Sequence, residues 1–115
     1  MKNYGPRTEM MEYDIEANHL GTFWYKLGTN QMHRTDGPAI ERADGSKWWY
    51  QNDKLHRTDG PAIEYANGTK SWWLDGKRHR EGGPAIEFAD GTKEWYLNGK
   101  ELAEEEFNRR ISRSK

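Results

Sequence analysis

The fold of this chain follows from one stretch, His33-Arg34-Thr35-Asp36-Gly37-Pro38-Ala39-Ile40-Glu41, which occurs again unchanged and a third time with Glu81-Gly82 in place of Thr-Asp. The second copy runs from His56 to Glu64 and the third from His79 to Glu87, so each copy begins 23 residues after the one before. The same step relates three tryptophans, Trp49, Trp72 and Trp95. A fixed period of this length is typical of repeat architectures, in which each unit packs on its neighbours.

Each repeat contains two dipeptides that favour tight turns. In the last repeat these are Asp90-Gly91 and Asn98-Gly99, and earlier repeats have Asp44-Gly45, Asn67-Gly68 and Asp75-Gly76. Such dipeptides favour two-residue type I′ hairpins, because both central residues need positive φ. Proline lacks a backbone donor, so Pro38, Pro61 and Pro84 are expected at the first residue of a strand. The sequence therefore predicts an all-β fold, a single-layer antiparallel meander of hairpin repeats.

Two-residue turns also predict the cross-strand register. Counting outward from Asp90-Gly91 places Glu87 opposite Glu94 and Ile86 opposite Trp95. Counting in the same way from the Asp75-Gly76 turn places a tryptophan opposite a histidine in the next strand. One face of each repeat then carries an isoleucine, a tryptophan and a histidine, and we expect that face to form the core.

The opposite face of the predicted sheet carries a second aromatic column. It combines the small and acidic residues Ala39, Glu41 and Ala43 and their equivalents with Tyr50, Trp73 and Tyr96. A strand with large apolar groups on both faces is either covered on both sides or uses one side for binding.

The whole chain, 1–115, is predicted to be a single repeat domain. Residues 1–32 form an N-terminal cap and a degenerate repeat, residues 33–100 hold three repeats, and residues 101–115 form a C-terminal helix. In that tail Ala103, Phe107 and Ile111 recur at helical spacing, and acidic residues precede basic ones, which suits the helix dipole. We expect the apolar stripe of this helix to cap the end of the sheet.

Composition restricts what such a chain can bury and bind. Leu, Ile, Val and Phe together number only 14 of 115 residues, whereas Trp, Tyr and Phe number 15, so aromatic side chains must supply most of the core. The net charge of −1 argues against binding duplex nucleic acid or an anionic membrane. The chain has no cysteine, no leader-like segment and no stretch long enough to span a membrane, so we expect a cytoplasmic protein.

Two residue types of the repeat could carry chemistry: the histidines as metal ligands and the glutamates as catalytic carboxylates. Equivalent histidines of successive repeats lie roughly 10–14 Å apart, too far to share a metal ion, and are expected to pack on tryptophan and donate to turn carbonyls or to Asp36 or Asp59. Glu87 opposite Glu94 resembles a glycosidase carboxylate pair. However, the residues opposite the equivalent glutamates are Trp48 and Ser71, so a solvated β face is the expected reading. We therefore predict no enzyme, no metal and no cofactor.

The predicted partner-binding residues are Tyr50, Trp73, Tyr96, Trp48, Arg78, Arg57 and Arg80. Trp, Tyr and Arg dominate protein-binding hot spots, so a protein partner is favoured. The same rings and cations can also stack a nucleotide or a short single strand. A third reading is that the column is covered by residues 1–18, with Met10, Met11, Tyr13 and Ile15 supplying the apolar groups, or by a second copy of the chain.

The segments Asp75-Gly76-Lys77-Arg78-His79, Asp90-Gly91 and Asn98-Gly99-Lys100, with Trp95 between them, resemble the MORN repeat. The resemblance covers about residues 15–100 and is nearest to divergent arrays rich in His-Arg-x-Asp-Gly-Pro-Ala that occur in phage and bacterial proteins. It implies an elongated single-layer sheet used for contacts with proteins, sometimes by self-association.

These features together predict a non-catalytic binding protein. The concrete expectation is a phage or bacterial accessory protein that occupies and blocks a host protein, such as a defence or regulatory protein, in the host cytoplasm. The alternative is a sponge that sequesters a nucleotide-like signalling molecule. A homo-oligomer is also expected, because open sheet edges and spare aromatic side chains favour association.

Overall fold

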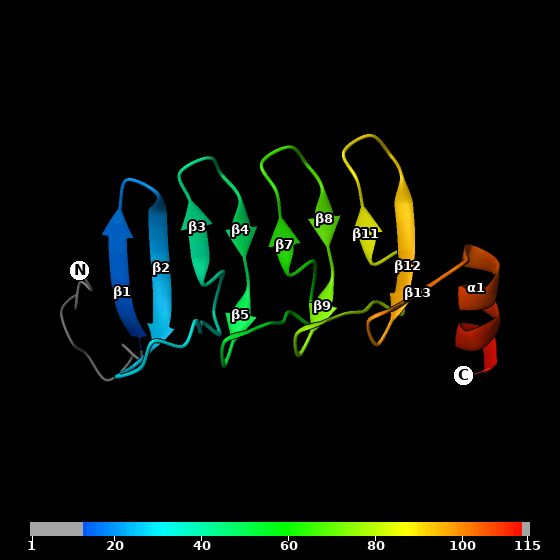
Figure 1. Cartoon of the computed structure of the whole chain (residues 1–115), viewed down its shortest axis with the longest axis horizontal. Helices are drawn as coiled ribbons and strands as arrows, with labels where there is room; N and C mark the ends of the chain where they lie inside the picture. Colours follow the sequence, from blue (N-terminus) through cyan, green and yellow to red (C-terminus); the bar gives the residue numbers. More distant parts are fainter. Residues whose placement is uncertain (1–12, 114–115) are drawn as a thin grey trace.

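The protein is a row of antiparallel hairpins that lie side by side in one layer, with a helix at its C-terminal end (Figure 1). The computed structural model describes residues 13–113 and measures 51 × 29 × 18 Å along its principal axes. The predicted fold class, an all-β antiparallel meander with a C-terminal helix, is confirmed.

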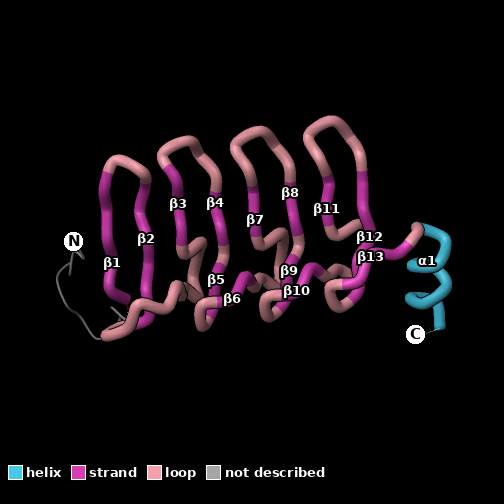
Figure 2. The backbone as a smooth tube through the Cα atoms, in the orientation of Figure 1, coloured by secondary structure: helices cyan, strands magenta, loops and turns pink. Residues whose placement is uncertain are grey.

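Nine strands form the main sheet, and two short pairs extend two of its hairpins (Figure 2). In sheet order the nine are β1 (Tyr13–Asn18), β2 (Gly21–Lys26), β3 (Ile40–Arg42), β4 (Lys47–Trp48), β7 (Ile63–Glu64), β8 (Lys70–Ser71), β11 (Ile86–Glu87), β12 (Lys93–Leu97) and β13 (Lys100–Leu102). The short pairs are β5 (Tyr50–Gln51) with β6 (Lys54–Leu55), and β9 (Trp73–Leu74) with β10 (Lys77–Arg78). The helix α1 spans Glu104–Arg113.

The turns at the lower edge of the sheet, as drawn in Figure 1, are the predicted type I′ turns. Asp75 and Gly76 have φ of 48° and 80°, and Asn98 and Gly99 have φ of 51° and 84°. The predicted register around the first of these turns is confirmed, because Leu74 pairs with Lys77 and Trp73 pairs with Arg78 in the structure.

The upper turns differ from the prediction because they contain three residues. In the last repeat, Phe88 pairs with Thr92, Gly91 donates its N–H to the Phe88 carbonyl at 2.9 Å, and only the glycine has positive φ. Asp90 accepts the Thr92 N–H on its side chain at 2.9 Å, an Asx-type bond that stabilises this form of turn. The turns at Gly45 and Gly68 have the same geometry, so the two-residue turns predicted there are wrong as well.

Because each upper turn has three residues instead of two, the pairing of its two strands shifts by one residue. Side chains that were predicted to share a face therefore lie on opposite faces. Ile86 lies opposite Glu94 and Glu87 lies opposite Lys93, where the sequence predicted Ile86 opposite Trp95. The predicted isoleucine–tryptophan–histidine core face is therefore wrong. The isoleucines lie on one face with Trp48 and Trp73, and the small alanines share the other face with Trp24, Trp49 and Trp72. Both sets are buried: Ala39, Ala62 and Ala85 have no exposed surface and Ile40, Ile63 and Ile86 have 5% each.

The degenerate first repeat is two residues longer because its lower turn is a four-residue loop. Lys26 donates its N–H to the Gln31 carbonyl, which encloses residues 27–30 where the next repeat has only Asn52 and Asp53. The buried Asp14 accepts the Gly28 N–H at 2.9 Å and anchors this loop. Gly21 permits the β2–β3 contact, since a Cβ there would lie 2.3 Å from the Glu41 carbonyl oxygen.

The helix α1 packs against β12 at the end of the row. It begins three residues later than the tail predicted to be helical, because Lys100–Leu102 forms the edge strand β13. Phe107 and Leu102 are buried, at 3% and 9% exposure. No helix within residues 13–113 is long and apolar enough to cross a membrane.

Acid should loosen the helix through Glu106. Hydrogen bonds from Arg110 and Arg109 lower the pKa of Glu106 from 4.5 to about 2. Because folding lowers this pKa, the contribution to stability is complete above pH 4.5 and is lost as the pH falls towards 2. In far-ultraviolet circular dichroism, the wild type should lose helical signal over this interval. Glu106→Gln should lack that component, and an identical acid profile in both proteins would contradict the assignment.

Candidate functional site

One face of the sheet carries a ladder in which arginine side chains lie flat on tryptophan rings. We call it the Arg–Trp face. The pairs are Arg34 on Trp24, Arg57 on Trp49 and Arg80 on Trp72, with the guanidinium carbon 4.0, 3.9 and 3.8 Å from the ring centroid. Trp95 has no such arginine, because the position 23 residues after Arg80 is Ala103. Instead Phe107 and Ile111 of α1 share the groove beside Trp95.

Hydrogen bonds hold each arginine within its repeat. Arg57 donates from Nε to Asp59 at 2.9 Å and from Nη1 to the Pro61 carbonyl at 3.0 Å and to Glu64 at 3.1 Å. The bond from Arg57 lowers the pKa of Asp59. Each of these arginines lies within van der Waals reach of a glycine: a Cβ on Gly60 would approach the Arg57 guanidinium carbon to 2.9 Å. The motif therefore encodes a cation clamped between an indole and a glycine.

The histidines of the motif have a structural role different from the predicted one. In each repeat the Nδ1 atom accepts the backbone N–H of a lower-turn residue that lies 19 residues later in the chain, at 2.9 to 3.0 Å. The donors are Asn52, Asp75 and Asn98. These bonds differ from the predicted donation to turn carbonyls or to Asp36 or Asp59, because here a ring nitrogen accepts, and they join successive hairpins.

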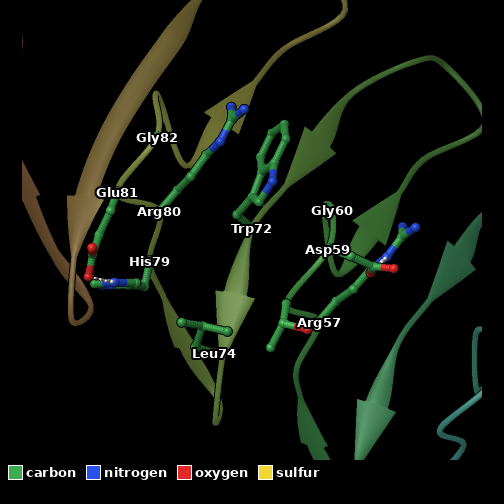
Figure 3. Close-up of a pocket in the computed structure, with 10 residues that line it drawn as sticks. Arg57, Asp59, Gly60, Trp72, Leu74, His79, Arg80, Glu81 and Gly82 are labelled. Carbon is green, nitrogen blue, oxygen red and sulfur yellow. Dashed lines mark hydrogen bonds and ion pairs between the residues drawn. The ribbon is translucent and has the colours of Figure 1, made fainter.

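Shallow polar grooves separate the repeats on the Arg–Trp face. One groove, of about 610 Å³, lies between the Arg57–Gly60 turn and the His79–Gly82 turn and is also lined by Trp72 and Leu74 (Figure 3). A groove of about 430 Å³ occupies the equivalent place one repeat earlier, at Trp49. The third, about 510 Å³, lies between the Glu81–Pro84 turn and α1. The helix thus stands where the turn of a further repeat would stand.

The opposite side of the sheet is the aromatic face, formed by Trp48, Tyr50, Tyr65, Trp73, Phe88 and Tyr96. Tyr65 is 40% exposed and the other rings are half-buried. Arg42 lies 5.1 Å from the Trp48 ring, and Arg78 lies 4.7 Å from Trp73 and 5.0 Å from Tyr96. Among residues 13–113, two buried donors lack a hydrogen-bond partner, Trp48 Nε1 and Arg78 Nε, and both belong to this face.

Partial burial changes the chemistry of the tyrosines in this face. Desolvation is the main cause that raises the pKa of Tyr50 and of Tyr96. Tyr96 donates its hydroxyl hydrogen to Glu94 at 3.2 Å, and Trp73 donates its indole N–H to Ser71 at 2.8 Å. The rings are therefore neutral and held by their neighbours, which suits a rigid contact surface.

The structure divides the seven predicted partner-binding residues between the two faces. Trp48, Tyr50, Trp73, Tyr96 and Arg78 lie together on the aromatic face. Arg57 and Arg80 lie on the Arg–Trp face, over Trp49 and Trp72. Successive residues of a strand point to opposite sides of the sheet, so these two rings lie on the side opposite to their neighbours Trp48 and Trp73.

Sequence reasoning missed Tyr65, Phe88 and Arg42 as members of the aromatic face. Each follows a motif isoleucine by two residues and so lies on the isoleucine face. The predicted register placed the aromatic column on the face opposite the isoleucines, so this relation was not recognised.

The predicted cover of the aromatic column is contradicted where it can be examined. Ile15 pairs directly with Trp24, which places β1 side chains Ile15 and Tyr13 on the Arg–Trp face. The Tyr13 hydroxyl accepts the Thr35 N–H at 3.0 Å, against the first repeat turn. Met10 and Met11 lie outside the described residues.

The glutamates of the repeat motif alternate with lysines across the strands of the sheet. Glu87 lies between Lys70 and Lys93 in the register, and Glu41 and Glu64 lie opposite lysines in the same way, so the predicted Glu87–Glu94 pair and the Trp48 and Ser71 pairings are wrong. Opposite charges facing each other across strands stabilise the sheet. Within the described range 13–113, no group of three or more His, Cys, Asp or Glu side chains is placed to hold a metal ion.

No protein-family model, curated protein or solved structure matches this chain. The function proposed below therefore rests on the geometry of the two faces of the sheet.

Proposed function

We propose that the protein is a non-catalytic binding protein that docks a partner protein on its aromatic face. The observation that carries the proposal is a row of half-buried and exposed aromatic rings on one side of a single-layer sheet. The helix packs at the end of the row, where it shares a groove with Trp95 on the other side of the sheet.

The chemistry of the aromatic face suits a protein surface. Trp, Tyr and Arg are the residues most enriched in binding hot spots, and this face combines all three. Arg42 and Arg78 rest on rings, which limits the side-chain entropy lost when a partner binds. The near-neutral charge of the chain, −1, is compatible with a contact dominated by apolar area.

The alternative proposal, a nucleotide sponge, has weaker support. Stacking a base requires an accessible ring face, and on the aromatic face Arg42 already lies over Trp48 and Arg78 over Trp73 and Tyr96, at 4.7 to 5.1 Å. A thermal-shift series with a nucleotide panel separates the two functions, because a tight ligand raises Tm by mass action whereas a protein-binding surface gives no shift.

The biological setting is part of the same proposal. The 23-residue hairpin period and the His-Arg-x-Asp-Gly-Pro-Ala motif support a MORN-like repeat protein of the phage or bacterial type. In that setting the aromatic face would occupy and block a host protein in the cytoplasm.

Substitutions on the aromatic face should weaken partner binding. After a partner is recovered by pull-down from the host, Trp73→Ala and Tyr65→Ala should each raise its Kd by about 30-fold, the effect of losing a hot-spot side chain. Lys70→Ala, an exposed residue of the opposite face, is the matched control and should leave Kd within about threefold. Equal binding by all four proteins would refute the aromatic face as the docking surface. A homodimer that Tyr65→Ala dissociates in light scattering would show instead that a second copy occupies it.

A further inference from the structure

The three motif arginines are equivalent in sequence but differ in their hydrogen-bond partners. Arg34 and Arg57 each donate from Nε to an aspartate two residues later, Asp36 or Asp59, at 2.9 Å. The residue two after Arg80 is Gly82, which has no side chain. Arg80 keeps its Nη1 bonds to the Pro84 carbonyl and to Glu87, both at 3.1 Å, but no described residue accepts a hydrogen bond from its Nε.

The side chain of Arg80 is also more accessible than its equivalents. It is 27% exposed, whereas Arg34 and Arg57 are 20% exposed. It lines the groove of about 610 Å³ together with Trp72 and Gly82. Figure 3 shows the Arg80 side chain alongside Trp72 in this groove.

Glu81 does not fill the place of the missing aspartate. Its carboxylate lies 3.3 Å from Nε2 of His79, and Figure 3 shows it directed towards that ring and away from the Arg80 guanidinium. Two further carboxylates are also engaged: Asp59, which lines the groove, is bonded to Arg57, and Glu87 bonds Arg80 through Nη1.

We infer that Arg80 binds a carboxylate supplied from outside the chain, the acidic side chain of a bound protein. The ligand carboxylate takes the place that Asp36 and Asp59 hold in the first two repeats, accepts the Nε–H of Arg80, and lies in the groove above Trp72. This site lies on the Arg–Trp face, so it is independent of the aromatic face and goes beyond the function proposed above.

The surroundings favour a carboxylate over a phosphate. The first two repeats already contain this interaction, since the carboxylates of Asp36 and Asp59 each accept the Nε–H of the equivalent arginine at 2.9 Å. Asp59 and Glu81 line the groove and Glu87 bonds Arg80, and their negative charge opposes a dianion more strongly than a monoanion. A charge-assisted bond of this kind is stronger than a neutral one and discriminates against an uncharged amide.

The experiment titrates the full chain with a short peptide, acetyl-Gly-Glu-Gly-amide, and observes the arginine Nε–H resonances by NMR. The Arg80 signal should shift and saturate, with a Kd at least about tenfold lower than that of the matched acetyl-Gly-Gln-Gly-amide peptide. Arg34 and Arg57 should not respond, because their own aspartates occupy them. Inorganic phosphate at equal ionic strength is the second arm and should bind more weakly than the glutamate peptide.

Two substitutions make the test sharp. Gly82→Asp restores the aspartate of the other repeats, and a Cβ at that position meets no atom within 4 Å, so the fold should be retained and the Arg80 response lost. Asp59→Gly is the reverse change and should make Arg57 responsive. The inference is overturned if Arg80 responds no more than Arg34 and Arg57, if Gly82→Asp leaves the response unchanged, or if phosphate binds more tightly than the glutamate peptide.

Discussion

Replacing Phe107 with alanine should lower the free energy of unfolding by about 3–5 kcal/mol, the usual cost of truncating a buried phenylalanine. Phe107 is 3% exposed and belongs to α1, which packs against β12. At this end of the row the helix replaces a further repeat, because Ala103 stands where an arginine would cover Trp95. Removing the ring undocks the helix and leaves both Trp95 and the strand β13 open to water.

Chemical denaturation followed by tryptophan fluorescence measures this change. Glu105→Ala is the matched control, because Glu105 is exposed on the same helix and its loss removes only a favourable charge near the helix N-terminus, less than about 1 kcal/mol. If Phe107→Ala unfolds within about 1 kcal/mol of the wild type, the helix is not an essential cap of the sheet.

Replacing Arg57 with alanine should destabilise the protein by about 2–4 kcal/mol, because several groups lose their partner together. Trp49 loses the cation on its ring, and the Pro61 carbonyl and Glu64 lose a donor in a part-buried position. Arg57→Lys should restore less than half of the loss, since an ammonium group cannot stack as a plane and donate from two nitrogens in the same geometry.

Arg80→Ala provides the internal comparison for this series. Arg80 bonds one carboxylate, whereas Arg57 bonds two, so its loss should cost less in the same denaturation measurement. Full rescue by lysine, or a larger effect at Arg80 than at Arg57, would contradict the role assigned to the clamp.

The members of the aromatic face were predicted only in part from the sequence. Tyr50, Trp73 and Tyr96 were expected to form one column, and the structure places them on one face with Trp48 and Arg78. Arg57 and Arg80 were grouped with them, although they clamp rings on the other side. Spacing along the chain identifies equivalent residues in different repeats, but the side of the sheet depends on register.

The 23-residue period, the meander, the lower type I′ turns and the C-terminal helix were all determined by local sequence, because each depends on residues close together in the chain. The tertiary structure decided the upper turns, where the Thr69 hydroxyl accepts the Ala89 N–H of the next turn at 3.0 Å and the loop contains one residue more than predicted. That single residue moved the isoleucines to the other face and set Glu87 against Lys93. Only the structure revealed that the aspartate two residues after a motif arginine accepts its Nε–H, so that Gly82 leaves Arg80 short of a carboxylate, since the partner of an arginine is chosen by three-dimensional proximity.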